Sequence, residues 1–310
     1  MTNAYWIRAL AAMLLVASPL AAQEDRDRDR DRDDEYRSRI DTTVTIDRGG
    51  TVELSLVAGE IEVTGASGDR VRVNAVSERG LLRFDASRSR VVLEVRSERG
   101  RTGDTRYEVT VPTGTRVIMR SVSGEISATG VNGEVEAHTV SGDIDIADAA
   151  TRAEFESVSG EVSIARVRGN VRGSAVSGGL MIDNVNGEVD VETVSGEITL
   201  ANVQSRWVRA ATVSGEVEFE GTIDPAGRYE LGSHSGTVRL LLLGEVNATV
   251  NVETFSGSID SDFPMTLEPG ETGRRRQFRF RIGNGGARIS AHSFSGSIDI
   301  ERGTRRGNQE

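Results

Sequence analysis

Residues 121–164 read SVSGEISATGVNGEVEAHTVSGDIDIADAATRAEFESVSGEVSI, a stretch in which the dipeptide Ser-Gly returns at a fixed interval. The same interval separates five consecutive copies, at Ser123, Ser141, Ser159, Ser177 and Ser195. It becomes slightly longer before Ser214, Ser235 and Ser256, and a last copy follows at Ser295 after about twice the usual gap. A fixed period of this kind indicates a repeat protein whose units stack on one another.

Apolar residues recur at six positions of each unit, counted from its Ser-Gly glycine. Offsets 2, 4 and 7 hold mainly valine and isoleucine, and offsets 11, 13 and 16 repeat that spacing nine residues later. Apolar residues two apart, with β-branched side chains dominant, predict short strands rather than a helix. We therefore expect two strands and six inward side chains in each coil, including Trp207 at offset 11 and, at offset 16, Val140, Val158, Val176, Val194 and Val213.

Two short strands and two corners in every unit close each coil on itself, and matching positions of successive coils stack into parallel ladders about 4.8 Å apart. The predicted fold class is all-β: a parallel β-solenoid, or β-helix, with coils of roughly 18 residues, right-handed, and with an irregular β N-terminal cap. A left-handed hexapeptide helix does not fit, because its pattern recurs every six residues. A triangular right-handed helix is the nearest alternative. Glycine permits positive φ at the corner, and we interpret the serine before it as structural.

Residues 1–22 are typical of a secretory signal peptide. They carry one charged side chain, Arg8, ahead of an apolar run from Ala9 to Val16, which is shorter than the roughly 20 residues that span a bilayer. We expect an exported protein, periplasmic or at the cell surface, whose mature chain has no transmembrane span. The chain has no cysteine, which excludes a lipid-modified cysteine, disulfides and thiolate metal sites.

Composition divides the remainder of the chain into four segments. Residues 23–39 alternate mainly acidic and basic side chains, which predicts a disordered Asp/Arg-rich spacer. Residues 40–120 are strand-like but irregular, and they should form N-terminal strands and a cap continuous with the solenoid, because an uncapped end exposes free strand edges. Residues 121–301 hold the solenoid repeats with an insertion at 261–286, and residues 302–310 are expected to form a disordered tail.

One succession of motifs carries a family resemblance. YEVTVPTGT at residues 107–115 leads into SVSGEI at 121–126 and VNGEV at 131–135. This succession resembles the bacterial putative-adhesin domain of unknown function, over roughly residues 42–300. The resemblance implies a secreted or envelope-associated protein with β-helix repeats and a non-enzymatic binding or adhesion role, with some relatives tied to envelope-stress responses. That family carries no agreed catalytic or binding residues, so it assigns none here.

An acidic column follows the corner glycine, and it consists of Glu125, Asp143, Glu161, Glu197 and Glu216. Gly179 interrupts this column and the Gly-Gly-x-Gly-x-Asp calcium repeat is absent, so a solvated face is favoured over weak cation binding or carboxylate catalysis. The histidines are too few and too scattered for a metal site: His138, His234 and His292. We expect no catalytic residues, no metal site and no cofactor.

Charged residues on the second strand of each coil predict ion pairs between neighbouring coils. Glu134 precedes Arg152 by one coil, and Glu188 precedes Arg206 in the same way. Exposed pairs of this sort contribute roughly 0 to 1 kcal/mol each. They favour solubility and register more than binding.

One basic segment contrasts with the acidic chain, RRRQFRFRI at residues 274–282. Alternation predicts that Phe278, Phe280 and Ile282 point inward. The arginines either lie against the protein's own acidic faces or bind an anionic envelope polymer or lipid headgroups. Nucleic acid is not expected, since loss of Arg8 with the signal peptide would shift the net charge from −11 to −12. The candidate ligand-binding residues are Arg274, Arg275, Arg276, Arg279 and Arg281.

These observations predict a non-enzymatic extracytoplasmic protein of the bacterial cell envelope with an adhesin-like binding or scaffold role. Its expected partner is an anionic envelope polymer or another envelope protein. Two alternatives stay open at this point. One is a polysaccharide-acting β-helical enzyme, and the other is an envelope-stress sensor that binds another envelope protein.

Overall fold

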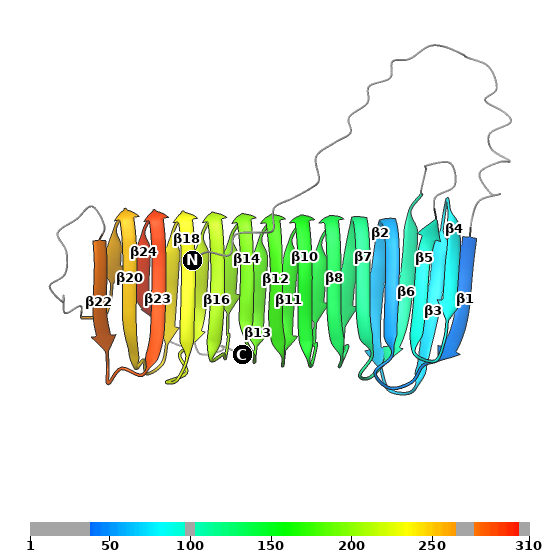
Figure 1. Cartoon of the computed structure of the whole chain (residues 1–310), viewed down its shortest axis with the longest axis horizontal. Helices are drawn as coiled ribbons and strands as arrows, with labels where there is room; N and C mark the ends of the chain where they lie inside the picture. The colour runs from blue at the N-terminus through cyan, green and yellow to red at the C-terminus, as the bar shows by residue number, and fades with distance from the viewer. Residues whose placement is uncertain (1–37, 97–102, 265–275, 304–310) are drawn as a thin grey trace, which may run out of the picture. The chain divides into compact units, whose positions relative to one another are not determined.

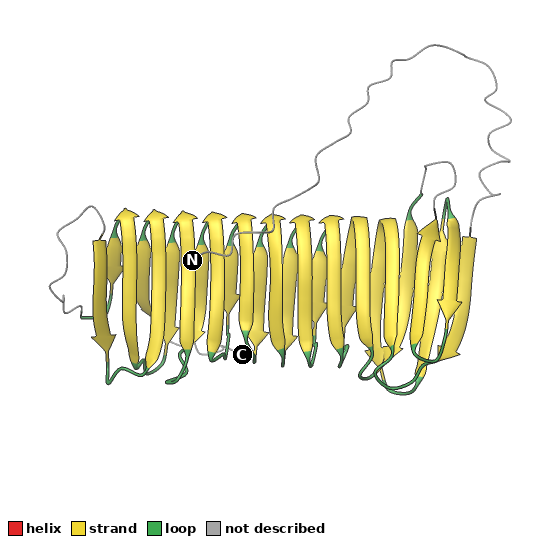
Figure 2. Ribbon diagram, viewed as in Figure 1, coloured by secondary structure: helices red, strands yellow, loops and turns green. Residues whose placement is uncertain are grey.

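The computed structural model describes residues 38–96, 103–264 and 276–303, and within these ranges the chain forms 24 strands and no helix (Figure 2). The strands stand side by side in a long row (Figure 1). Each regular coil contributes one strand before its Ser-Gly corner and one after it. We call the surfaces built from these strands the pre-glycine face and the post-glycine face. No helix in the described ranges could span a membrane.

Six regular coils form the middle of the row. Equivalent strands of neighbouring coils pair in parallel without a shift in register, so that Ser159 lies opposite Ser141 and Ser177. The predicted parallel β-solenoid is thus confirmed, and each coil has two strands rather than a triangular section. The coils are β8 (Glu134–Ser141) with β9 (Ile144–Ala147), β10 (Arg152–Ser159) with β11 (Val162–Val167), β12 (Asn170–Ser177) with β13 (Leu180–Val185), β14 (Val189–Ser195) with β15 (Ile198–Ala201), β16 (Trp207–Ser214) with β17 (Val217–Thr222), and β18 (Arg228–Ser235) with β19 (Val238–Leu243).

The core is a stack of inward side chains from the two faces. Offsets 2, 4 and 7 are buried as predicted; in one coil they are Ile144, Ile146 and Ala149. Offset 11 is also buried, but Trp207 does not belong to it. Val208 pairs with Val189 and takes the inward place, because the longer unit adds its extra residue before the strand.

The prediction for offset 16 is wrong. The five valines assigned to it expose 46–49% of their surface. The cause is a difference between the two corners. The corner after offset 4 contains a residue with left-handed backbone, such as Asn184 (φ 55°), which reverses the alternation and turns offset 7 inward. No such residue interrupts the strand before the serine, so offset 15 points inward instead, at Thr139, Ser157, Ala175, Thr193 and Thr212.

At the C-terminal end the coils do not follow the order of the sequence (Figure 1). The last coil, β23 (Ala287–Ser295) with β24 (Ile298–Gly303), lies between β18–β19 and the earlier coil of β20 (Ala248–Ser256) and β21 (Ile259–Ser261). The predicted insertion contains β22 (Arg276–Ile282), which pairs antiparallel with the outer edge of β20. The chain therefore builds the outermost coil first and returns to fill the place behind it.

The N-terminal end has a similar inversion. β2 (Thr51–Ala66) runs across both faces, and it lies between β7 (Arg116–Thr129) on one side and β5 (Arg90–Arg96) and β6 (Thr105–Pro112) on the other. Three antiparallel strands complete this irregular cap. β3 (Arg70–Ser77) pairs with β6 and with β1 (Ser38–Thr45), and β4 (Leu81–Ala86) pairs with β5.

Candidate functional site

The basic segment places two arginines on the pre-glycine face at the C-terminal end. Within β22, Phe280 and Ile282 are buried and Phe278 is half-buried, whereas Arg279 and Arg281 are exposed. Alternation along the strand therefore follows the predicted pattern. Two further candidates, Arg274 and Arg275, lie outside the described residues. Arg276 begins β22, and its side chain lies outside the described part as well.

Strand pairing brings other arginines next to β22. Arg281 lies opposite Thr249 of β20, Thr249 lies opposite Arg288 of β23, and Arg288 lies opposite Arg228 of β18. One level of the solenoid thus carries three arginines across four adjacent strands. We call this level, together with Arg279, the arginine groove. The hollow at this level has a volume of about 570 Å³, and its lining includes Arg228, Arg279 and Arg288 with Glu230, Asn251 and Ser290. Arg281 lies at the same level of the solenoid and is not part of this lining.

Tyr229 anchors the inner side of the groove. Its hydroxyl donates a hydrogen bond to the carbonyl oxygen of Ser205 at 2.7 Å and accepts one from the backbone N–H of Asp224 at 2.8 Å. Burial raises the pKa of this hydroxyl, so it stays protonated at neutral pH. The strand that carries Arg228 is therefore fixed from inside the core.

The arginines of the groove differ from those elsewhere on the same face. Arg172 and Arg209 flank Asp190 at 3.3 and 3.2 Å. In the groove, Arg228 contacts Glu230, with 2.7 Å between Nε and Oε1. Within the described part of the chain, no carboxylate pairs with the remaining three groove arginines, which are Arg279, Arg281 and Arg288.

The two predicted ion pairs have different outcomes. Glu134 contacts Arg152 with 3.9 Å between Oε1 and Nη1, as the coil spacing predicts. Arg206 contacts Asp224 at 3.2 Å rather than the predicted Glu188. All of these side chains are at least partly exposed, so water screens each pair and its contribution to stability is small.

The acidic column lies along the Ser-Gly corners. Glu125, Asp143, Glu161 and Glu197 are exposed, and Glu216 contacts Arg239 at 3.1 Å. Within the column, the Asp143 carboxylate accepts a hydrogen bond from the backbone N–H of Glu161 at 2.8 Å. Among the described residues, no group of three or more acidic or histidine side chains is arranged to hold a metal ion.

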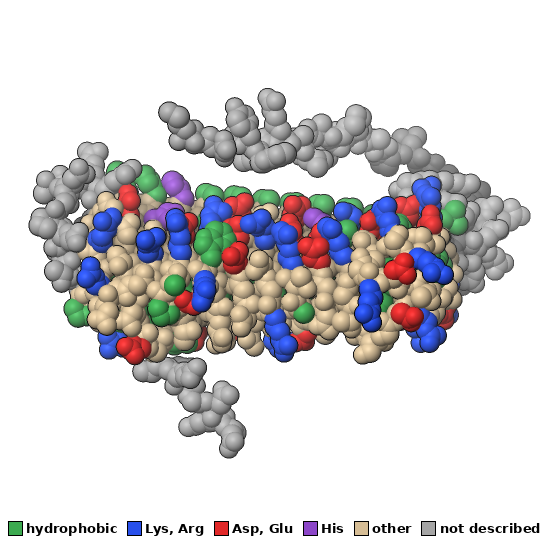
Figure 3. Space-filling model, turned by 60° about the horizontal axis from the view of Figure 1, so that its bottom comes forward, with side chains coloured by type: hydrophobic (Ala, Val, Ile, Leu, Met, Phe, Trp, Pro, Cys, Tyr) green, Lys and Arg blue, Asp and Glu red, His purple; other side chains and the backbone are tan. Residues whose placement is uncertain are grey.

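The exposed valines of offset 16 form a continuous row that the sequence did not reveal. Equivalent positions in the other coils extend the row at both ends, with one residue per coil. Along the solenoid in Figure 3, hydrophobic side chains follow one edge. We call this row the apolar ridge, and its members in spatial order are Val57, Val122, Val140, Val158, Val176, Val194, Val213, His234, Phe294 and Phe255.

Aromatic rings terminate the apolar ridge at its C-terminal end. The ring centroids of His234 and Phe294 are 4.8 Å apart, and those of Phe294 and Phe255 are 4.9 Å apart, with nearly parallel planes in both pairs. The other two histidines occupy one column two residues before the ridge. There, His138 Nδ1 is 3.1 Å from a carboxylate oxygen of Glu156. All three histidines thus lie on the pre-glycine face. Among the described residues, none of them belongs to a group of side chains that could hold a metal ion.

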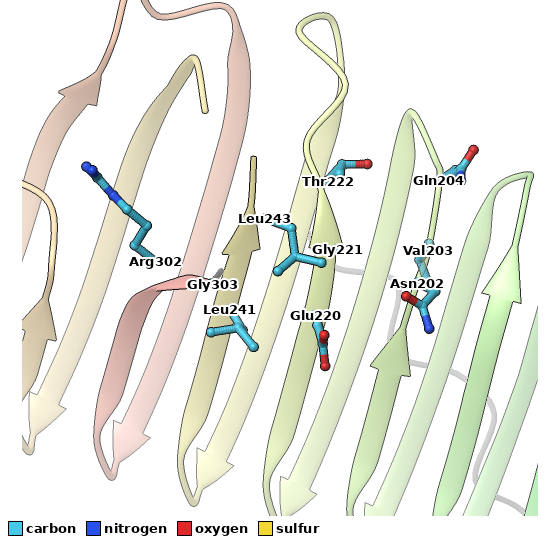
Figure 4. A pocket seen from close by; sticks show the side chains of 10 residues that line it. All are labelled: Asn202, Val203, Gln204, Glu220, Gly221, Thr222, Leu241, Leu243, Arg302 and Gly303. Atoms are coloured by element: carbon cyan, nitrogen blue, oxygen red, sulfur yellow. The ribbon is translucent and has the colours of Figure 1, made fainter. Parts of the chain in front are cut away.

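A second hollow lies on the post-glycine face near the C-terminal end, with a volume of about 630 Å³ (Figure 4). Its walls include Leu241, Leu243, Glu220 and Arg302. Arg302 points away from Glu220 (Figure 4) and lies over the ring of Phe263, 4.9 Å from its centroid. Because the two charged side chains of this hollow diverge, it does not assemble an acid–base pair.

The stacked coils and the regular Ser-Gly corners define a β-solenoid repeat protein. The family model of Toastrack DUF4097 matches residues 44–172 and again residues 134–301. The chain therefore belongs to the Toastrack DUF4097 family. A search of curated proteins found no match.

Solved structures with detectable similarity come from several bacteria. A putative cell adhesion protein from Clostridium sporogenes is 11% identical, with 86% of this chain and 100% of that chain covered and a TM-score of 0.23. A putative adhesin from Bacteroides fragilis is 13% identical, with 85% and 97% covered and a TM-score of 0.40. A putative adhesin from Parabacteroides merdae is 12% identical, with 86% and 96% covered and a TM-score of 0.27. At these values the similarity carries no argument about ligands.

Proposed function

We propose that the chain is a non-enzymatic, adhesin-like binding protein of the bacterial cell envelope, and that the arginine groove binds an anionic envelope polymer. The observation that carries this proposal is the row of Arg281, Arg288 and Arg228 beside Arg279 in a chain of net charge −11. Guanidinium groups bind carboxylate and phosphate with two parallel hydrogen bonds. The signal-peptide pattern of residues 1–22, which lie outside the described residues, supports export.

The spacing of the groove suits a repeating ligand. Neighbouring strands are about 4.8 Å apart, so Arg228 and Arg288 are about one strand apart and Arg281 is about two strands further. An extended polymer with regularly spaced negative charges can contact these arginines in sequence. The remainder of the chain is acidic and would repel the same polymer at other places.

Replacing Arg279, Arg281 and Arg288 together with glutamine is expected to abolish binding to an anionic polymer. Each charged hydrogen bond that is lost should weaken binding by about ten-fold or more. Polygalacturonate and polyphosphate serve as carboxylate and phosphate probes, with dextran as the neutral control, and binding is measured by calorimetry at two salt concentrations. Wild-type binding should weaken as salt rises.

A matched variant separates the groove from general charge. Arg116, Arg172 and Arg209, which already contact carboxylates, are replaced with glutamine in the control protein. Equal loss of binding in both triple variants would contradict the proposed groove. Unchanged polymer binding in the groove variant, with a lowered unfolding temperature, would show that its arginines are structural. Release of sugar ends from polygalacturonate by the wild-type protein would contradict the non-enzymatic assignment.

A further inference from the structure

The apolar ridge is a large exposed feature that the proposed function does not use. Each of its valines is about half-exposed; Val176, for example, exposes 47% of its surface. The seven valines and two phenylalanines of the ridge, at roughly 50 Å² each, give about 450 Å² of apolar surface. A patch of this area is in the range of the largest that monomeric proteins expose, and such patches are often functional.

The shape of the apolar ridge restricts what can cover it. The ridge has one side chain per coil, and the coils are about 4.8 Å apart, so ten members extend over about 43 Å in a line. A partner must present apolar groups at the same interval along a straight edge to bury all of them. A second copy of this ridge meets that requirement by construction, because its side chains have an identical period.

We propose that the apolar ridge is the contact surface for a second copy of this chain, in a side-by-side dimer with a two-fold axis along the ridge. The exposed serine column beside the ridge, which begins with Ser123 and Ser141, adds to the contact. Ridge and serines together reach about the 800 Å² per partner that a standard specific interface buries. A two-fold interface uses the same patch on both copies.

Charge on the two flanks of the ridge favours this orientation. One flank is the acidic column. The other is a mixed column, in which Arg120, His138, Ser174, Ala211 and His292 lie among Glu156, Glu192 and Glu253. A two-fold axis along the ridge places the acidic column of one copy against the mixed column of the other. The antiparallel arrangement would place the two acidic columns opposite each other and is disfavoured by repulsion. The parallel arrangement also brings the aromatic ends of the two ridges together.

Sedimentation equilibrium of the full chain tests the proposal. We expect a dimer at micromolar concentration. Val158→Thr, Val176→Thr and Val194→Thr combined keep the β-branched shape but remove apolar contact from both copies, and they should raise the dissociation constant at least about 100-fold. At protein concentrations where the wild type is also monomeric, the unfolding temperatures of the two proteins should be equal. Met181→Thr is the matched control, because Met181 is 58% exposed on the post-glycine face. That variant should dimerise like the wild type.

Two results would overturn the proposal: a wild-type chain that is monomeric at about 100 µM, or a triple ridge variant that dimerises as strongly as Met181→Thr. Orientation is tested separately by Val122→Cys, which is informative because the chain has no cysteine. Val122 lies near one end of the ridge, so it meets its own counterpart only when the two ridges are parallel. Disulfide-linked dimer after mild oxidation supports the stated axis, and its absence in a dimeric protein contradicts that axis.

Discussion

Gly178→Ala is expected to destabilise the folded protein by about 3 kcal/mol or more, whereas Gly179→Ala next to it should change stability by less than about 1 kcal/mol. Gly178 has a φ of +122°, and a Cβ placed there would lie 2.0 Å from the carbonyl oxygen of Gly160 in the neighbouring coil. A Cβ on Gly179 would have no atom within 4 Å. The two substitutions are chemically identical and adjacent. Any difference between their effects on stability therefore comes from the backbone conformation and close stacking at Gly178.

Urea-induced unfolding followed by far-ultraviolet circular dichroism measures both variants. The Gly178 variant should unfold at a clearly lower urea concentration than the wild type, and the Gly179 variant should unfold close to it. Equal destabilisation of the two variants would mean that general helix or strand propensity, rather than the stacked corner, explains the glycine column. Equal tolerance would show that the coils can separate locally at little cost.

The Ser-Gly period allowed the architecture of the regular coils to be predicted, because the corner glycine has a backbone requirement that no other residue meets. The sequence was a weaker guide to which side chains point into the core. The sequence suggested that the two halves of each coil are equivalent, but their corners are placed differently. In the first half, a left-handed residue such as Arg166 or Asn202 precedes offset 7, whereas in the second half the corner glycine follows offset 16. The set of inward side chains predicted just before the serine is therefore wrong, and the prediction placed the valines of the apolar ridge in the core.

The order of coils at the ends was beyond prediction from one sequence. Ser256 and Ser295 identify two equivalent coils, but β23 can pair with β18 as well as with β20, and both pairings exist. A repeat pattern shows which strands are able to pair with one another, but it does not show which two of them are neighbours in the folded chain. The same limit explains why Arg228 and Arg288 were missed as partners of Arg281, since their proximity depends on this coil order.

Removing residues 143–178 is expected to leave a folded solenoid that is shorter by about 10 Å, the width of two strand spacings, whereas removing residues 143–169 should prevent folding. The first deletion removes two whole coils and joins Gly142 to Gly179, so β8 leads into β13 with each face preserved. The second removes one and a half coils and joins Gly142 to Asn170. It directs β12, a strand of the pre-glycine face, to the post-glycine face. Val171 and Gly173 still fall at the inward offsets 2 and 4, but the corner at Gly178 then lies opposite the other Ser-Gly corners, and the polar side chain of Asn184 falls at the inward offset 15.

Two coils are removed because single coils here are not equivalent in volume. Phe155 occupies the space beside Gly173, where an added Cβ would lie 2.4 Å from its ring. Removing only residues 143–160 would place Ala137 beside Gly173 and leave a cavity, which typically costs several kcal/mol. Removing both coils places Ala137 beside Val191, a pairing of ordinary size. Thermal unfolding and small-angle scattering measure the outcome. Coils with two sides predict cooperative unfolding for the deletion of 143–178 and not for that of 143–169, because the stability of stacked repeats depends on contacts between whole neighbouring units. Equal behaviour of these two deletions would contradict coils of this kind.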